Sequence, residues 1–130
     1  MTPKNLDHVV LQVHDMSRSL AFYCDMLGLK PERLKDFRQG RAPFVSVRIG
    51  SSLIDLFPSE NPGSGPHHLC LEFEESITKI EELLAAHNIP HNPPDLRFGA
   101  QGMGSSLYVH DPDGHMVELR SYGVPRKPIP

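Results

Sequence analysis

Apolar and other residues alternate in two segments of the chain that lie sixty residues apart. The first is residues 5–13 (NLDHVVLQV) and the second is residues 66–73 (PHHLCLEF). An apolar period of two predicts a strand with one face on a core. His8 and His68 occupy equivalent places in the two copies and fall on the face opposite the apolar one. The pattern therefore predicts a duplicated strand that carries one histidine on its non-core face in each copy.

An amphipathic helix is expected after each of these strands. In the first half, Asp15 and Ser17 offer capping oxygens, and Gly28 supplies a left-handed stop. In the second half, a capped helix ends near Asn88. The apolar stripes are Leu20, Tyr23, Cys24 and Leu27 in the first helix and Ile77, Ile80, Leu83 and Leu84 in the second. Each stripe is expected to pack on a sheet.

Shorter apolar runs, separated by turn-forming residues, predict the remaining strands. These strands are expected at 44–49, 53–57, 105–109 and 115–120, whereas 30–38 is a weak strand or a loop and 90–104 holds prolines and glycines. The order of strand, helix and about three strands thus occurs twice. We expect an α+β fold with a single domain at 1–123, halves at about 4–58 and 66–122, a linker at 59–65 and a flexible tail at 124–130.

The last strand of each half places an acidic residue between two aliphatic ones, Asp55 in the first half and Glu118 in the second. Because the aliphatic neighbours face the core, the two carboxylates turn to the face that carries the histidines. The candidate metal ligands are therefore His8, Asp55, His68 and Glu118. Imidazole and carboxylate groups together suit divalent ions such as Zn, Ni, Mn, Co or Fe.

A lone histidine on a strand is usually solvent-exposed or satisfied by a hydrogen bond, and this is the alternative interpretation. This alternative has to explain why two histidines and two carboxylates occupy equivalent positions of the repeat and the same face of their strands. The coincidence favours a site made of His8, His68 and Glu118. For Asp55 two roles stay open: a direct ligand, or a residue that acts through a water or orients a histidine. The other six histidines are expected at the surface.

Composition narrows the class of protein. The chain has 130 residues, a net charge of −3, 38% hydrophobic residues and 22% charged residues, as ordinary globular domains do. No basic run indicates nucleic-acid binding, no apolar stretch reaches the about 18 residues of a membrane span, and the N-terminus lacks a signal-peptide layout. The two cysteines do not make a disulfide framework. We therefore expect a cytoplasmic protein with no nucleic-acid or membrane partner.

Three segments of the chain resemble a known superfamily. L-D-H-V-V-L-Q-V-H-D-M comes first, S-L-A-F-Y-C-D-M-L-G-L follows, and L-Y-V-H-D-P-D-G-H-M-V-E-L-R-S-Y comes last. Residues 4–122 resemble the vicinal oxygen chelate superfamily, which includes glyoxalase I, bleomycin and fosfomycin resistance proteins, extradiol dioxygenases and methylmalonyl-CoA epimerase. The segment R-F-G-A-Q-G at 97–102 is most similar to small glyoxalase I-like domain proteins, often labelled lactoylglutathione-lyase-like.

The resemblance implies paired βαβββ modules that form a cup-shaped, mostly antiparallel sheet around a divalent metal. It implies a lyase or isomerase of the glyoxalase I type, acting on a small oxygenated substrate, with a thiol such as glutathione as a candidate cofactor and a homodimer as the expected assembly. The metal would polarise two adjacent oxygens, and Glu118 would be the catalytic base that moves a proton through an enediolate. Candidate substrate-binding residues are Arg97, Tyr108, Arg38 and Arg41. Glyoxalase I usually has glutamate, glutamine or histidine where this chain has Asp55.

Two other functions stay open. An extradiol-type dioxygenase would use the two strand histidines and Glu118 as an Fe(II) triad. Tyr108 fits the extradiol pattern Y-x-x-D-P-x-G-x-x-x-E, but that pattern also wants a histidine near 99–101, where this chain has glycine, alanine and glutamine. An antibiotic-resistance protein of the fosfomycin or bleomycin type ranks third. Arg120 is the one cation near the last strand that could serve a phosphonate, and metal-free bleomycin-type proteins normally lack the histidine–glutamate set.

Overall fold

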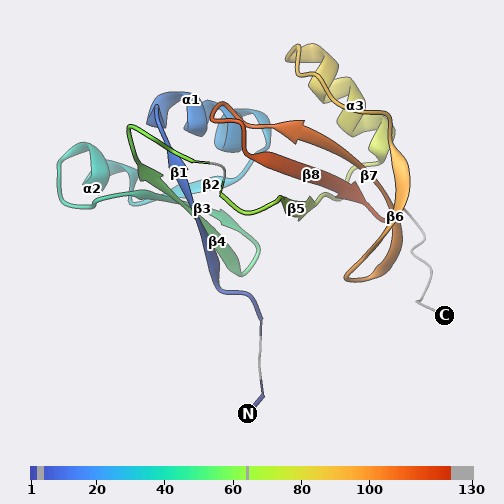
Figure 1. The fold of residues 1–130 in the computed structure, drawn as a ribbon, viewed down its shortest axis with the longest axis horizontal. Helices are drawn as coiled ribbons and strands as arrows, with labels where there is room; N and C mark the ends of the chain where they lie inside the picture. The colour runs from blue at the N-terminus through green and yellow to red at the C-terminus, as the bar shows by residue number, and fades with distance from the viewer. Residues whose placement is uncertain (3–4, 64, 124–130) are drawn as a thin grey trace. The chain divides into compact units, whose positions relative to one another are not determined.

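The computed structural model describes residues 1–2, 5–63 and 65–123 (Figure 1). The chain divides into two compact units, Met1–Gly65 and Pro66–Pro130, and each unit has its own sheet. The tail predicted at 124–130 lies outside the described residues.

The first unit is a four-stranded sheet with the order β1-β4-β3-β2. Its elements are β1 (His8–Val13), α1 (Met16–Leu20), η1 (Ala21–Met26), β2 (Lys30–Glu32), α2 (Leu34–Arg38), β3 (Val45–Ile49) and β4 (Ser52–Pro58). β1 and β4 run parallel, and the other two pairings are antiparallel. Parallel neighbours need a long crossover, which here contains the helices and two strands. The segment predicted to be a weak strand or a loop forms β2 and α2.

The first helix begins where the sequence predicts but changes its winding. Asp15 caps it by accepting a hydrogen bond from the backbone N–H of Arg18 at 3.2 Å. The helix continues from α1 into the π-helical turn η1, and Gly28 follows with a φ of 86°. Phe22 and Met26, which lie outside the predicted stripe, are buried in η1. A π-helical turn adds a residue per turn, so the apolar stripe shifts around the helix axis.

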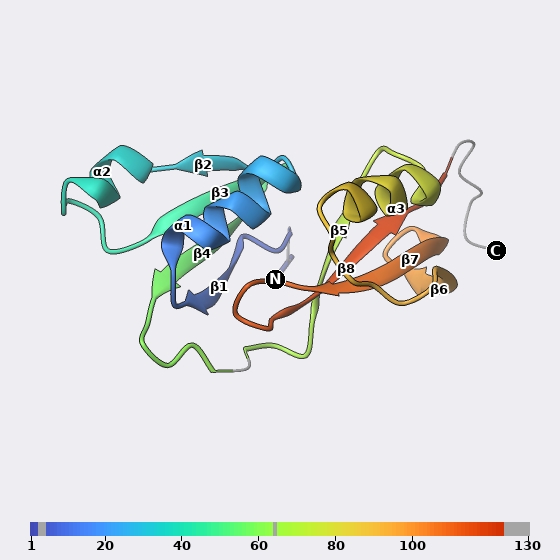
Figure 2. The same cartoon turned by 90° about the horizontal axis from the view of Figure 1, so that it is seen from above.

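The second unit repeats this layout with the order β5-β8-β7-β6, and β5 runs parallel to β8. Its elements are β5 (Leu69–Glu72), α3 (Ile77–Ala86), β6 (Asp95–Gly99), β7 (Gly102–His110) and β8 (Met116–Ser121). Ser76 caps α3 by accepting a hydrogen bond from the backbone N–H of Lys79 at 3.3 Å. Figure 2 shows α1 lying over the sheet of the first unit and α3 lying over the sheet of the second.

The core of each unit is made by the apolar positions of the alternating strands. In β1, Leu11 and Val13 are buried, whereas His8 and Gln12 are exposed. The buried apolar side chains of the first unit include Leu11, Val13, Tyr23, Val45, Val47, Ile54 and Leu56, and those of the second include Leu71, Ile80, Leu84, Leu107, Val109, Val117 and Leu119. The alternation therefore predicts correctly which face of β1 carries its histidine.

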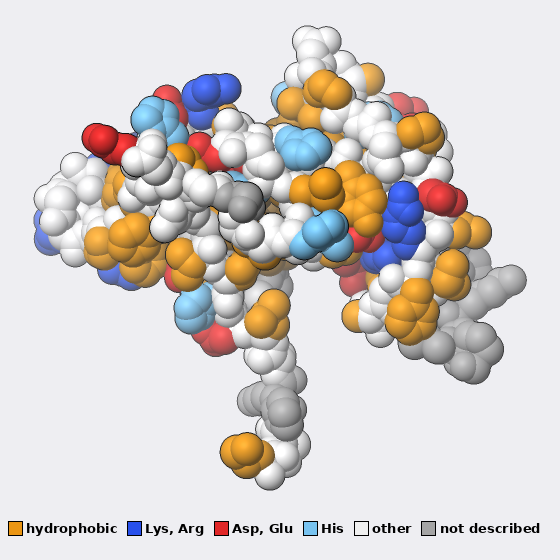
Figure 3. Space-filling view, viewed as in Figure 1, with side chains coloured by type: hydrophobic (Ala, Val, Ile, Leu, Met, Phe, Trp, Pro, Cys, Tyr) orange, Lys and Arg blue, Asp and Glu red, His pale blue; other side chains and the backbone are white. Residues whose placement is uncertain are grey.

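The segment at 95–104 forms a regular hairpin that the sequence pattern does not predict. β6 pairs with β7 so that Gly99 lies opposite Gly102. The apolar residues Leu96 and Phe98 of β6 are 64% and 72% exposed. Figure 3 shows hydrophobic side chains at the surface in this part of the chain. An edge strand whose apolar side chains face solvent has no core pattern that would reveal it in the sequence.

The fold is α+β and consists of two βαβββ units, as the sequence predicts. Each sheet is mixed because its first strand joins its last strand in parallel. Across the described residues, no helix combines the length and the apolarity that crossing a membrane requires.

Candidate metal centre

The first unit places His8 beside Asp55. His8 opens β1, and Asp55 lies in the neighbouring strand β4, opposite Val10. The Nε2 atom of His8 lies 4.0 Å from Oδ2 of Asp55. Two ligand atoms on one divalent ion are separated by about 3.0–3.4 Å when each bond is about 2.1 Å. This pair would have to close slightly to share an ion, or one of its members would act through a water.

One further residue holds each member of this pair. Ser46 of β3 donates its hydroxyl to Oδ1 of Asp55 at 2.6 Å. Asp7 Oδ2 lies 2.8 Å from Nδ1 of His8. Because an ionised carboxylate only accepts, Nδ1 of His8 carries the proton and Nε2 is left for an ion. The hydrogen bond to Asp7 raises the pKa of His8; desolvation opposes this rise and the charge of Asp55 adds to it.

The second unit brings His68 and Glu118 closer together. Glu118 of β8 lies between Cys70 of β5 and Tyr108 of β7, and His68 immediately precedes β5. Nε2 of His68 lies 3.2 Å from Oε1 of Glu118. That distance falls between the about 3.0 Å of an octahedral edge and the about 3.4 Å of a tetrahedral one. The donor atoms of this pair therefore fit one divalent ion as they stand.

Arg120 holds the other oxygen of Glu118. Its Nη2 donates to Oε2 of Glu118 at 3.0 Å, and both side chains are buried. The same guanidinium donates to the backbone carbonyl oxygens of Arg97 at 2.9 Å and Phe98 at 3.2 Å. A Cβ added at Gly99 would lie 2.7 Å from Cζ of Arg120, so the absence of a side chain there makes room for the guanidinium.

The charges around Glu118 set its protonation. Burial raises the pKa of Glu118, but the Ser106 hydroxyl and the Arg120 guanidinium together lower it by more, so it lies below the ordinary value. Cys70 is exposed as a residue, but partial desolvation of its thiol and the charge of Glu118 raise the pKa of that thiol to about 11. Burial and the same charge also raise the pKa of Tyr108. At neutral pH this cluster therefore contains a carboxylate, a thiol and a phenol.

Two of the predicted substrate-binding residues lie against the second pair. The ring of Tyr108 is edge-on to the ring of His68, with centroids 5.5 Å apart and planes at 88°. The guanidinium of Arg97 lies over the Tyr108 ring, 5.0 Å from its centroid. The other two lie in the first unit: Arg41 donates from Nη2 to Oδ1 of Asp36 at 3.0 Å, and Arg38 ends α2 and is exposed. In the described part of the chain it forms no ion pair with either member of the first pair.

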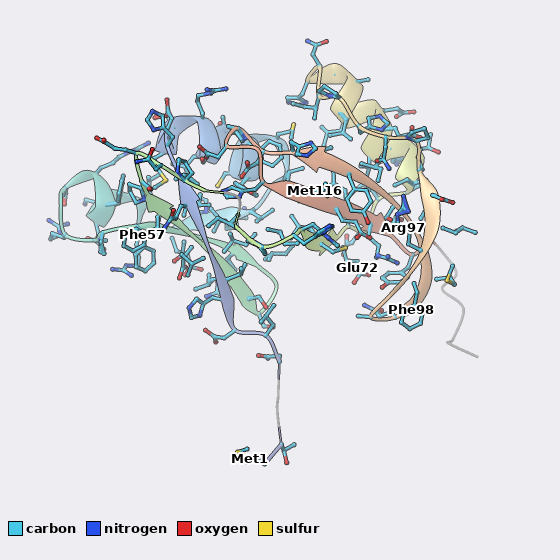
Figure 4. All side chains as sticks on the ribbon, viewed as in Figure 1. Met1, Phe57, Glu72, Arg97, Phe98 and Met116 are labelled. Atoms are coloured by element: carbon cyan, nitrogen blue, oxygen red, sulfur yellow. The ribbon has the colours of Figure 1, made fainter. Side chains whose placement is uncertain are left out.

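A pocket of about 310 Å³ opens beside Glu118 in the second unit. Glu118 and Arg120 line it together with the apolar ring of Phe98. Gln101 borders the pocket and donates its side-chain amide to Oε1 of Glu72 at 2.8 Å. Figure 4 labels Glu72 of β5 and Phe98 of β6, two of the residues that line this pocket. The volume lies at the lower end of the range for small-molecule sites.

The four predicted ligands form two pairs, one in each unit. His8 and Asp55 make the first pair, and His68 and Glu118 make the second. Among the described residues, three or more histidine, cysteine, aspartate or glutamate side chains do not gather with a geometry that would hold a metal. Each pair supplies half of the expected ligand set, and the meeting of the two pairs on one ion stays a prediction.

Several contacts of these pairs were not predicted from the sequence. They come from Asp7, Ser46, His67 and Arg120. Asp7 and His67 each precede a candidate ligand histidine, at the spacing of the repeat, so the sequence contained a signal for both. The roles of Ser46 and Arg120 depend on which strands are neighbours in the sheet, and a local sequence pattern does not predict the strand order.

The expectation that the remaining histidines lie at the surface is wrong for His115. Its side chain is 2% exposed. The backbone N–H groups of Asp113 and His115 both donate to Oδ1 of Asp111, at 2.9 and 2.8 Å, and the resulting tight turn directs the chain into β8. The histidine follows a turn, as its sequence position suggests, but the turn folds it inward.

Residues 5–119 match the sequence model described as the Glyoxalase/Bleomycin resistance protein/Dioxygenase superfamily. The chain belongs to this superfamily. The match covers both histidine–carboxylate pairs and confirms the resemblance seen in the sequence. Membership in the glyoxalase superfamily agrees with two βαβββ units in one chain.

Individual members of the glyoxalase superfamily are similar over most of the chain. The glyoxalase domain-containing protein RDO1 of Mycosarcoma maydis is 33% identical over 94% of this chain and 70% of its own length. The virulence protein STM3117 of Salmonella typhimurium is 32% identical over 90% of this chain and 83% of its own. The crystal structure of that virulence protein matches with a TM-score of 0.80, covering 95% of this chain and all of the other at 26% identity. The probable lactoylglutathione lyase of Synechocystis sp. is 27% identical over 86% of this chain and 91% of its own.

Proposed function

We propose that the protein is a divalent-metal-dependent lyase or isomerase of the glyoxalase I type that acts on a small oxygenated molecule. The observation that carries this proposal is the 3.2 Å separation of His68 Nε2 and Glu118 Oε1, which suits two ligands of one ion. Similarity to a protein named as a probable lactoylglutathione lyase supports the same reaction class.

In this proposal, both pairs contribute to one site. His8 and His68 supply imidazole ligands and Glu118 supplies a carboxylate. Asp55 completes the set directly or through a water, since its Oδ2 lies 4.0 Å from His8 Nε2. Such a set suits Zn, Ni, Mn, Co or Fe. The two pairs would come from one chain or from the two chains of a homodimer.

The residues of the second unit define the proposed chemistry. A divalent ion at this site would polarise two adjacent oxygens of the substrate and acidify the neighbouring C–H group. Glu118, ionised at neutral pH, would take the proton from one carbon and return it to the next. Arg120 donates to Oε2 of Glu118 at 3.0 Å, so Oε1 would be the oxygen that faces the ion and that takes the proton once it is displaced from the ion. Arg97 of the second unit and Arg38 of the first are the candidates to hold an anionic end of the substrate or of a thiol such as glutathione.

A second candidate is an extradiol-type dioxygenase that uses Fe(II) on the two histidines and Glu118. The position of Tyr108 favours this candidate, because its ring is edge-on to that of His68 at 5.5 Å and it lies opposite Glu118 in the sheet. A protonated phenol at that place can donate a hydrogen bond to a substrate oxygen.

Ion titration followed by two assays tests these proposals. Chelator-treated full-length protein is titrated with Zn²⁺, Ni²⁺, Mn²⁺, Co²⁺ or Fe²⁺, and bound ions are counted by elemental analysis. The loaded protein is then assayed for proton exchange in the glutathione–methylglyoxal hemithioacetal and for oxygen consumption with catechols. Proton exchange is the expected result, and oxygen consumption would select the second candidate. Failure to bind any of these ions would remove both.

Variants show whether the named residues are the ligands. His68→Ala and Glu118→Gln should weaken ion binding by more than the roughly 10–100-fold that changes outside the ligand set produce. His87→Ala is the matched control, because His87 is an exposed histidine at the end of α3 whose Nδ1 lies 3.0 Å from the Leu83 carbonyl oxygen. Sedimentation velocity on the loaded protein tests the expected homodimer.

A further inference from the structure

The residue before each candidate histidine ligand contacts Nδ1 of that histidine. In the first unit, Asp7 Oδ2 lies 2.8 Å from Nδ1 of His8. In the second unit, Nδ1 of His67 lies 2.8 Å from Nδ1 of His68. Asp7 and His67 are sixty residues apart, which is the spacing of the repeat. The same position of both halves therefore carries a hydrogen-bond partner for the ligand histidine.

We propose that His67 is a positioning residue for His68, and that it sets which nitrogen of His68 is presented to the ion; this inference rests on the proposed metal site. A ring nitrogen binds an ion only through a free lone pair, so the proton of a neutral imidazole must sit on its other nitrogen. His67 provides the acceptor for that proton.

Three groups fix the ring of His68. His67 contacts its Nδ1, and the two rings meet at 72° with centroids 5.0 Å apart. Tyr108 lies edge-on to the ring at 5.5 Å. Glu118 Oε1 lies 3.2 Å from its Nε2. Rotation of the ring about its side-chain bonds would break at least two of these contacts, so the orientation of Nε2 toward Glu118 is set before an ion arrives.

The hydrogen bond between His67 and His68 has a direction that depends on the ion. Without an ion, the carboxylate oxygen 3.2 Å from Nε2 of His68 favours a proton on Nε2, so Nδ1 of His68 would accept from Nδ1–H of His67. With an ion on Nε2, Nδ1–H of His68 donates to Nδ1 of His67, which then carries its own proton on Nε2. The proton between the two Nδ1 atoms passes from His67 to His68, the Nε2 proton of His68 goes to solvent, and Nε2 of His67 gains a proton from solvent. Each ring keeps one proton, so the exchange involves no net change in charge.

The first unit has an aspartate and the second a histidine before the candidate ligand, and the distance from Nε2 of that ligand to its carboxylate accounts for the difference. The carboxylate of Asp7 only accepts, which locks the tautomer of His8, and Nε2 of His8 lies 4.0 Å from Oδ2 of Asp55, too far for a hydrogen bond. Nε2 of His68 lies within reach of Glu118, so its partner must donate in one state and accept in the other. An imidazole can do both. A carboxylate at position 67 would also add a second negative charge close to Glu118.

The first arm of the test is the ion-free protein. Long-range ¹H–¹⁵N spectra of the imidazoles, recorded at about pH 8 where histidines are ordinarily neutral, identify the protonated nitrogen of each ring. We expect His67 as the Nδ1–H form and His68 as the Nε2–H form. Both rings as Nε2–H would mean that no hydrogen bond joins their Nδ1 atoms, and this would overturn the inference whatever the protein binds.

The second arm is ion affinity, measured with Zn²⁺ against a chromophoric chelator. We expect His67→Ala to weaken Zn²⁺ binding by about tenfold, and His67→Asn to bind nearly as wild type does, because its amide oxygen can accept from Nδ1–H of His68. His87→Ala should match wild type. The Zn²⁺-loaded wild-type spectrum should show the Nδ1–H form of His68.

The outcomes separate this inference from the proposed function. Equal Zn²⁺ affinity in wild type and His67→Ala, or an unchanged His68 tautomer on loading, overturns the positioning role while the metal site stands. A wild-type protein that binds none of the titrated ions overturns the proposed function and the role of His67 toward an ion. In that case the ion-free spectra still show whether the imidazole pair exists.

Discussion

Arg120 donates a hydrogen bond to Oε2 of Glu118 at 3.0 Å, and the two side chains are only 4% and 6% exposed. At the equivalent place two residues after Asp55, the first unit has Phe57, whose ring stacks on a neighbouring phenylalanine at 5.5 Å (Figure 4). The two halves have the same strand order but surround their carboxylates differently. The guanidinium of Arg120 fixes the orientation of the Glu118 carboxylate even when no metal ion is bound. The carboxylate of Asp55 is instead held by a hydrogen bond from the Ser46 hydroxyl.

Removing this cation should destabilise the second unit. Arg120→Met leaves the buried carboxylate of Glu118 unpaired, and we expect a loss of about 3–5 kcal/mol in the free energy of unfolding. Urea unfolding followed by circular dichroism measures the change. The double variant Arg120→Met/Glu118→Gln removes both charges and should recover a large part of the loss. A double variant as unstable as the single one would contradict the pairing.

The stability of the protein should depend on pH through Glu118. Burial raises the pKa of this carboxyl, but Ser106 and Arg120 outweigh burial and lower it below the ordinary 4.5. As pH falls below about 4.5, Glu118 therefore takes up its proton in the unfolded chain before it does so in the folded one. The stabilisation is therefore complete above the ordinary pKa and is lost as pH falls through the lower folded value.

This dependence is measured by urea unfolding of wild type and Glu118→Gln at several pH values between about 7 and 3. Wild type should lose stability more steeply than the variant in the acid part of the range. Because both proteins share every other carboxyl group, the difference between the two curves isolates Glu118. Parallel curves would show that its pKa is not lowered by folding.

Ser46 should matter for Asp55. Its hydroxyl donates to Oδ1 at 2.6 Å in a buried setting, so Ser46→Ala should cost about 1–3 kcal/mol in the free energy of unfolding. If Asp55 binds the ion, the same variant should also weaken ion binding. Ser17→Ala, at an exposed serine of α1, is the control for loss of a hydroxyl. Ser46→Thr keeps the donor, and a loss as large as that of the alanine variant would show that packing is responsible.

Cys70 should react slowly with iodoacetamide although it lines the pocket. Burial and the charge of Glu118 raise the pKa of its thiol from 9.0 to about 11, so the thiolate fraction at neutral pH should be about 100-fold lower than in an unperturbed thiol. The alkylation rate is measured against pH in a Cys24→Ser protein, which leaves Cys70 as the one reacting thiol. Glu118→Gln should shift the profile to lower pH. A wild-type profile like that of free cysteine would contradict the effect.

The candidate ligands could be identified from the sequence because strand periodicity is local. Alternation places every second side chain on one face, so His8 and Asp55 share a face wherever β1 and β4 end up in the sheet. Because the second half repeats the pattern of the first, the same argument holds for His68 and Glu118. Strand periodicity did not predict the β6–β7 hairpin, because apolar side chains of its edge strand β6 face solvent and do not pack in a core.

The partners of those ligands were decided by tertiary structure. Ser46 reaches Asp55 because β3 lies beside β4, and Arg120 reaches the carbonyl groups of β6 across β7, where glycines leave space for a guanidinium. Strand order and the packing of long side chains are non-local, so periodicity carries no information about them. The sequence alone determined which face of its sheet each of these side chains occupies, because alternation is local, whereas the folded sheets determined the hydrogen bonds and charges around each one.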